Sequence, residues 1–183
     1  MPPRNPLYTA AVAGPNHLDI DAGLTVELAS TIAGARRRAQ RDGDHQVDTA
    51  HLLHALLEAD PEVRATFAEG GQVGRLLGYL VQRSIGYGLR WQGGIEDSGA
   101  LPVLGYSEVE GWSPVAARAL DAAYERAELR GGKRVRGVDL LMALLVDPRA
   151  RAVEVFEGTG IDMGELVARA EFQEGWEESE GEG

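Results

Sequence analysis

Two histidines, His51 and His54, stand three residues apart, and His45 precedes them in the same stretch. On one face of a helix this spacing can direct two imidazoles toward a metal ion. The chain has no cysteine, however, and neither histidine belongs to a His-Glu-x-x-His motif. We therefore expect packed or hydrogen-bonded histidines, and we predict neither a metal site nor any other cofactor.

A second possible chemistry is nucleophilic catalysis. Residues 105–109 read Gly-Tyr-Ser-Glu-Val, which approaches the Gly-x-Ser-x-Gly elbow of serine hydrolases but lacks its last glycine. Residues 132–134 do not complete a phosphate-binding loop, because Arg134 stands where a hydroxyl should bind magnesium. These patterns predict a protein that is not an enzyme. A metal-dependent or serine hydrolase on a helical scaffold is the alternative function.

Arginines gather at residues 36–38 and 41, and basic residues gather again between residues 126 and 136. A basic stripe could serve a nucleic-acid-associated regulator, which is a third possible function. The whole chain is acidic, however, with 18 basic residues, 29 acidic residues and a net charge of -11. Solvated helix faces explain the arginines better, and we expect no nucleic-acid partner.

The length of 183 residues suits one domain of ordinary size. No apolar run is long enough for a signal peptide or for the roughly 20 residues of a membrane span. Because disulfides are also impossible, we expect a cytoplasmic protein without a membrane partner. Residues 1–22 hold four prolines and predict a flexible arm, whereas glutamate and glycine in residues 173–183 predict an acidic disordered tail.

Helical periodicity and capping residues predict four helices in each half of the chain. The first four are expected from the N-cap Thr25 to Gly43, from Asp48 or Thr49 to Ala59, from Pro61 to the Gly70-Gly71 break, and from Val73 to Ser84. The second four are expected from the N-cap Ser113 with Pro114 to Arg130, and over residues 138–147, 149–157 and 162–172. The fold class is therefore all-α, with about eight helices.

The second half of the chain repeats the first at a spacing of 88 residues. Residues 52–57 read Leu-Leu-His-Ala-Leu-Leu, and residues 140–145 read Leu-Leu-Met-Ala-Leu-Leu. A slip of one residue then pairs Phe67 with Phe156 at a spacing of 89. Such self-similarity marks one supersecondary unit used twice, so we predict a pseudo-twofold duplication of a four-helix unit. Its parts are repeat one (23–84), an inter-repeat loop (85–111) and repeat two (112–172).

Each half thus contains a capped helix rich in alanine and arginine, a Gly-x-x-x-Val turn and a Leu-Leu-x-Ala-Leu-Leu helix. This pattern resembles the Clp repeat, the N-terminal domain of Clp-type AAA+ unfoldases. The resemblance covers about residues 24–84 and 112–172. It implies a double Clp repeat, here as a stand-alone protein without ATPase modules, which binds a Clp-type unfoldase, its adaptors or substrate proteins. We expect a non-catalytic adaptor, regulator or decoy in Clp-dependent proteolysis.

The resemblance also directs attention to the start of the second helix in each repeat. Unfoldases that recognise phosphoarginine carry a glutamate just before the histidine there, but this chain has Ala50 and Val138. Neither can pair with a guanidinium, so phosphoarginine binding is not expected. Our candidates for protein or peptide binding are polar neighbours of these positions and aromatic residues of the kind favoured at interfaces. They are Asp48, Thr49, His51, Asp139, Trp91, Tyr106 and Trp112.

Overall fold

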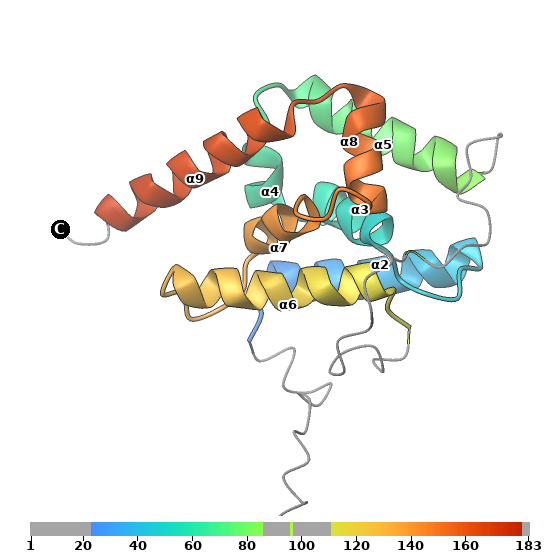
Figure 1. Cartoon of the computed structure of the whole chain (residues 1–183), viewed down its shortest axis with the longest axis horizontal. Helices are drawn as coiled ribbons and strands as arrows, with labels where there is room; N and C mark the ends of the chain where they lie inside the picture. The colour runs from blue at the N-terminus through green and yellow to red at the C-terminus, as the bar shows by residue number, and fades with distance from the viewer. Residues whose placement is uncertain (1–22, 86–95, 97–110, 181–183) are drawn as a thin grey trace, which may run out of the picture.

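The computed structural model of the chain describes residues 23–85, 96 and 111–180 (Figure 1). These residues form eight helices and no extended strand, which confirms the predicted all-α class. The first repeat contains α2 (Val26–Asp42), α3 (Thr49–Ala59), α4 (Pro61–Ala65) and α5 (Gly70–Ile85). The second contains α6 (Pro114–Leu129), α7 (Gly137–Leu144), α8 (Arg151–Thr159) and α9 (Met163–Glu180). No helix within the described ranges is long and apolar enough to cross a bilayer.

Two isolated parallel bridges join the repeats and relate them as a pseudo-twofold pair. Leu24 bridges Val135, and Val47 bridges Trp112. Leu24 and Trp112 are equivalent at the spacing of 88 residues, as are Val47 and Val135, so each bridge is the reciprocal of the other. In each bridge, the segment before the first helix of one repeat therefore pairs with the segment before the second helix of the other repeat.

Local capping explains where the first helix of each repeat begins. The Thr25 hydroxyl accepts a hydrogen bond from the Leu28 amide at 3.3 Å, and the Ser113 hydroxyl accepts one from the Ala116 amide at 3.0 Å. Both contacts satisfy amides that a helix N-terminus leaves unpaired. Gly43 ends α2 with a left-handed φ of 73°, a conformation that costs glycine little. The predicted caps are thus confirmed.

The core lies around α3 and α7, the central helices of the two repeats (Figure 1). The leucines of both leucine-rich segments are buried except for the partly buried Leu145, at the C-cap of α7. Beside them the rings of Phe67 and Phe156, the equivalent aromatic residues, lie 6.4 Å apart and nearly parallel. Helices α2 and α6 run together along one side of this core, and α5 and α8 pack on the other. The duplication therefore produces one shared core.

One prediction about the end of the chain is wrong. Residues 173–180 were expected in a disordered tail, but α9 continues to Glu180. Glu174 accepts hydrogen bonds from Arg126 at 2.7 Å and from Arg136 at 3.2 Å, and Gln173 donates to the carbonyl of Ala65 at 3.2 Å. These contacts anchor a segment whose composition alone predicts disorder. Similarly, Gly70-Gly71 forms the first turn of α5, where we expected only a break.

Candidate functional site

Two hollows lie at equivalent places, beside the first turns of α3 and α7. The first, which we call the charged pocket, has a volume of about 40 Å³ and lies between α2, α3, α5 and the start of α8. The second, which we call the apolar groove, has a volume of about 550 Å³ and lies between α4, α7 and α9. Ala50 lines the charged pocket, and its equivalent Val138 lines the apolar groove. The two repeats thus carry hollows of opposite chemistry.

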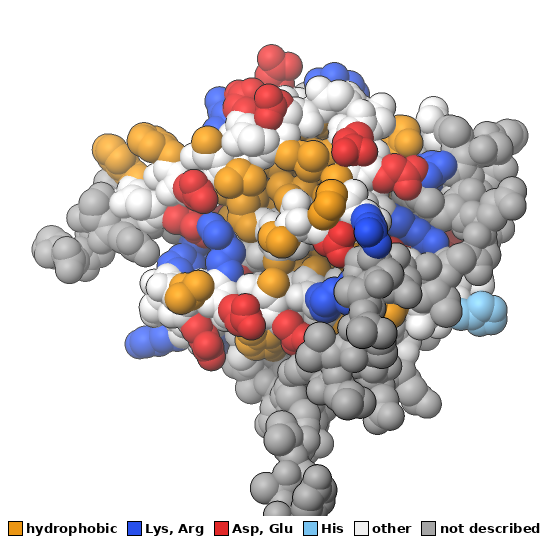
Figure 2. Space-filling view, in the orientation of Figure 1, with side chains coloured by type: hydrophobic (Ala, Val, Ile, Leu, Met, Phe, Trp, Pro, Cys, Tyr) orange, Lys and Arg blue, Asp and Glu red, His pale blue; other side chains and the backbone are white. Residues whose placement is uncertain are grey.

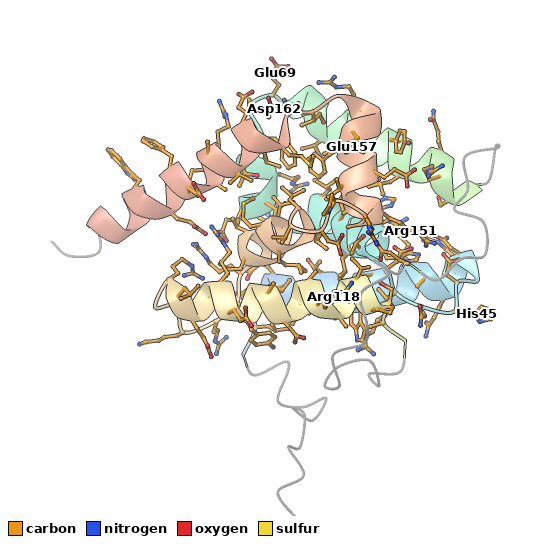
Figure 3. The ribbon with its side chains drawn as sticks, viewed as in Figure 1. His45, Glu69, Arg118, Arg151, Glu157 and Asp162 are labelled. Carbon is orange, nitrogen blue, oxygen red and sulfur yellow. The ribbon has the colours of Figure 1, made fainter. Side chains whose placement is uncertain are left out.

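The charged pocket is built around the N-cap of α3. The Asp48 side chain accepts a hydrogen bond from the His51 amide at 2.9 Å, and its other oxygen accepts one from Arg151 at 2.6 Å. Burial raises the pKa of Asp48, but its contacts with His51 and the charge of Arg151 outweigh burial and lower that pKa. Asp48 is therefore an ionised helix cap in the folded protein. Figure 3 shows Arg151 at the start of α8, facing this end of α3.

Two imidazoles in the charged pocket have opposite electrostatic environments. His51 has Nδ1 3.1 Å from the Asp48 amide nitrogen and Nε2 3.1 Å from Asp44 Oδ2. Burial lowers the pKa of His51, but Asp48, Asp44 and nearby Asp42 raise it above its ordinary value. Burial and the charge of Arg38 instead lower the pKa of His54 to about 4. His54 is consequently neutral at physiological pH.

A buried carboxylate, Glu96, connects the two repeats beside the charged pocket, and our sequence analysis did not select it. It accepts hydrogen bonds from the amides of Thr49 at 2.9 Å and Arg151 at 2.7 Å, and from the Ser113 hydroxyl at 2.8 Å. The Thr49 hydroxyl also donates to it and in turn accepts from the Ala152 amide. One side chain thus satisfies groups at the N-termini of α3, α6 and α8.

The pKa of Glu96 is raised above its ordinary value by burial and by the charge of Asp48, although the hydrogen bonds from Thr49 and Arg151 oppose this shift. Several other acidic residues occur in the same glycine-rich stretch of sequence. No local pattern distinguishes Glu96 from them, because its partners lie 17 to 55 residues away.

An ion pair with reversed charges marks the equivalent place in the second repeat. Arg136, equivalent to Asp48, lies 3.1 Å from Glu62, which is equivalent to Arg151 at the spacing of 89. Both pairs connect the N-cap of a central helix to a helix of the opposite repeat. The two ion pairs therefore occupy equivalent places in the two repeats, but the positions of the acidic and the basic residue are exchanged between them.

The apolar groove has a floor of small side chains and two exposed aromatic rings beside it. Ala65, Val138 and Ala170 line the groove, together with Phe172 and Trp176, which are 72% and 60% exposed. Figure 2 shows hydrophobic side chains gathered over the middle of this face and projecting from the α9 end, with charged side chains around them. Large apolar surface left open to solvent is typical of binding sites.

The predicted binding residues that are described are all buried. Asp48, Thr49, His51 and Trp112 are buried, although Asp48 and His51 also line the charged pocket. Asp139 is fully buried, where it accepts hydrogen bonds from the Arg136 amide at 2.8 Å and from Arg130 at 2.7 Å. Trp91, Tyr106 and the segment 105–109 lie outside the described residues. Asp48, Thr49 and His51 lie together at the start of α3, whereas Asp139 lies in the first turn of α7.

The contacts of His51 and His54 in the charged pocket do not resemble those of a nucleophile and its base. His51 Nε2 contacts Asp44, and His54 Nε2 lies 3.3 Å from Glu58. Ser84 also lines the pocket, but its hydroxyl donates to the Val81 carbonyl at 2.9 Å. This arrangement suits helix capping and ion binding better than covalent catalysis.

No protein-family model matches the chain, and no curated protein does. Several solved structures do match in fold. The N-terminal domain of the caseinolytic protease associated chaperone ClpD from Arabidopsis thaliana has a TM-score of 0.61 and 20% identity, over 83% of this chain and 94% of that one. The Hsp104 N-terminal domain from Candida albicans has a TM-score of 0.59 and 16% identity, over 80% and 88%.

A structure from investigations of a malarial protein secretion system has a TM-score of 0.58 and 14% identity, over 83% of this chain and 95% of that one. Because these sequence identities are low, the matches show similarity of fold alone. They agree with the resemblance recognised in the two leucine-rich helices and their preceding turns. The chain has the fold of the N-terminal domain of Clp-type and Hsp104 unfoldases.

Proposed function

We propose that this chain is a non-catalytic protein-binding module whose apolar groove takes an extended apolar segment of a partner protein. The partner would be a Clp-type unfoldase, one of its adaptors or a substrate protein, so that the chain acts as an adaptor, regulator or decoy in Clp-dependent proteolysis. The observation that carries the proposal is the exposure of Phe172 and Trp176 beside a groove with a floor of small side chains.

The aromatic rings supply the favourable free energy of binding. A Phe or Trp side chain presents about 150–250 Å² of surface, and covering apolar surface contributes about 25 cal/mol per Å². Covering most of both exposed rings is therefore worth several kcal/mol before the costs of association. The short side chains of Ala65 and Ala170 leave room for a ligand side chain between the rings and the floor.

The charges around the groove favour a partner with basic residues next to its apolar ones. Glu62 and Glu174 line the groove at its rim, where Glu62 contacts Arg136 and Glu174 contacts both Arg126 and Arg136. From residue 170 onward the chain holds six glutamates and no basic residue. Since opposite charges accelerate and orient association, lysine or arginine beside the apolar segment should strengthen binding at low salt.

Fluorescently labelled extended peptides can test the groove directly. We expect a peptide with a Leu-Phe-rich centre and arginine flanks to bind more tightly than the same centre with glutamate flanks, and a serine-substituted centre to bind least. The double variant Phe172→Gln/Trp176→Gln should weaken binding about tenfold or more, because two contact rings are lost. The control is Leu129→Gln, which alters a side chain that is 90% exposed and does not line the groove.

The proposal is refuted if the double variant binds the apolar peptides as well as the unaltered protein and the Leu129→Gln control. The role in proteolysis needs a second assay, in which a purified Clp unfoldase and peptidase degrade a model substrate. Adding this chain should raise or lower the degradation rate, and the groove variant should not. If the degradation rate does not change at a saturating concentration of this chain, the groove has no role in Clp-dependent proteolysis.

A further inference from the structure

The outer half of α9, residues 171–180, carries both exposed rings of the apolar groove, but its own sequence does not favour a helix. It holds five glutamates and no basic residue. Glutamates three or four residues apart repel one another on a helix, and negative charge is unfavourable near a helix C-terminus. Gly175 adds to this cost, because glycine is a poor helix former. The outer half therefore needs contacts with the rest of the protein in order to stay helical.

The inner half of α9 is fixed by apolar packing, whereas the outer half has an ionic contact. Leu166 and Ala170 are buried in the shared core. Beyond them, the Glu174 carboxylate lies 2.7 Å from Arg126 and 3.2 Å from Arg136, both within hydrogen-bond distance. The Glu174 side chain is only 14% exposed, so salt and water screen its attraction to the two guanidinium groups only in part.

The neighbours of Glu174 on α9 hold the outer half less firmly. Gln173 donates a hydrogen bond to the Ala65 carbonyl, but neither group is charged and the contact is exposed. Phe172 and Trp176 leave most of their surface in solvent, so burial of their rings adds little. Figure 1 shows the C-terminal end of α9 projecting beyond α4 and α7. Glu174, two residues from each ring, is therefore the charged anchor of this segment.

The first repeat holds its equivalent helix, α5, in a different way. At the spacing of 89 residues, Ile85 stands in the place of Glu174 and cannot form an ion pair. Arg83, which lines the charged pocket, instead contacts Glu154 of α8. The hollow of the first repeat has a volume of about 40 Å³, against about 550 Å³ in the second. The two repeats thus fix their last helices by ion pairs at different places, and the second has the wide groove.

We propose that Glu174 is the positioning residue of the apolar groove. Its bonds to Arg126 and Arg136 hold the outer half of α9 in the helical conformation that presents the two rings to a partner. This role rests on the proposed function, because it concerns ligand binding in the same groove. Arg126 does not line the groove, so its effect on binding passes through Glu174. Loss of the anchor releases the segment toward the disorder that its composition favours.

An apolar peptide with uncharged flanks tests this role, because such a peptide cannot form an ion pair with Glu174. We expect a Leu-Phe-rich peptide with serine flanks to bind at least fivefold more weakly to Glu174→Gln than to the unaltered chain. Arg126→Gln should also weaken binding, and adding it to Glu174→Gln should cause no further loss, because both remove the same contact. The matched control, Glu171→Gln, removes the same charge from an exposed position of α9 and should bind at least as tightly as the unaltered chain.

A rescue variant separates positioning of α9 from direct contact with the peptide. The space beside Gly175 is open, so an alanine fits there and favours the helix. Adding Gly175→Ala to Glu174→Gln should therefore raise the peptide affinity at least twofold above that of Glu174→Gln alone. A glutamate that acted only by contact with the peptide would not be rescued in this way.

Hydrogen exchange of the peptide-free protein needs no ligand. The amides of residues 172–176 should exchange at least fivefold faster in Glu174→Gln than in Glu171→Gln, while the amides of α3 and α7 exchange alike in both variants. The role of Glu174 is overturned if residues 172–176 exchange alike in the two variants, if the two variants bind the peptide equally, or if Gly175→Ala restores no affinity. Absence of peptide binding by the unaltered chain refutes the proposed function, whereas equal exchange in the two variants refutes the role of Glu174 alone.

Discussion

Replacing Glu96 by alanine should destabilise the fold more than any surface substitution, because one buried carboxylate satisfies four donors. Glu96 is 5% exposed, and its donors are the amides of Thr49 and Arg151 and the hydroxyls of Thr49 and Ser113. The hydroxyls can rotate toward other acceptors, whereas the two amides are fixed by their helices. A buried donor left without a partner costs about 1–3 kcal/mol, so two such amides cost roughly 2–6 kcal/mol.

Two effects reduce this cost. Water can enter the space left by the side chain, and removing the carboxylate also ends its repulsion from Asp48, which raises the pKa of Glu96. We therefore expect Glu96→Ala to lower the free energy of unfolding by about 3 kcal/mol. With an m-value of about 2 kcal/mol/M, the urea midpoint should fall by about 1.5 M. Glu96→Gln, which keeps one acceptor oxygen, should lose roughly half as much.

Urea unfolding followed by circular dichroism measures these differences, with Glu69→Ala as the control because Glu69 is exposed. Hydrogen exchange adds a local measurement, since the amides of Arg151 and Ala152 should exchange faster in Glu96→Ala. If Glu96→Ala loses no more stability than Glu69→Ala, within about 0.5 kcal/mol, Glu96 does not join the three helix ends and the reasoning is wrong.

Two further predictions concern close packing and pH. Gly137→Ala should lower the free energy of unfolding by about 1–3 kcal/mol, because the added Cβ would overlap the Asp60 carboxylate and Val63. Gly74→Ala should not destabilise α5, because the space beside Gly74 is open. Thermal unfolding of both variants measures the difference, and equal melting temperatures would contradict the prediction. Since the pKa of His54 is lowered to about 4, the folded protein keeps it neutral while the unfolded chain protonates it below about pH 6.5. The stability that depends on neutral His54 is thus present above pH 6.5 and is lost as the pH falls toward 4. The variant His54→Met, which copies the residue of repeat two, should lose less stability over this range, as measured by urea unfolding at several pH values. A His54 resonance that titrates near pH 6.5 would contradict the assignment.

Most of the fold could be predicted because its signals are local. The hydroxyls of Thr25 and Ser113 cap amides three residues away, and Gly43 closes α2 with its own backbone conformation. Leucines at helical spacing identify α3 and α7 as core helices whatever their neighbours are. The end of α9 could not be predicted, because Glu174 is held by Arg126 and Arg136, which lie 48 and 38 residues earlier.

The candidate site was predicted less well, because its character depends on contacts between repeats. Asp139 was selected as a binding residue, but it is buried beneath Arg130 and caps α7. Phe172 and Trp176 were placed in or beside a tail, and their exposure beside a groove follows from where α9 crosses α4 and α7. The side-chain types were known from the sequence; which of them face solvent was not.

The sequence by itself determined that one helical unit occurs twice, where its helices start, and that Ala50 and Val138 occupy equivalent positions without a glutamate. These properties follow from periodicity, capping and direct comparison of the two copies, none of which requires knowledge of distant neighbours. Only the tertiary structure decided that Ala50 lines a charged pocket and Val138 an apolar groove. Each hollow is completed by helices of both repeats, so its chemistry arises from residues that are far apart in the chain and meet only when the repeats pack.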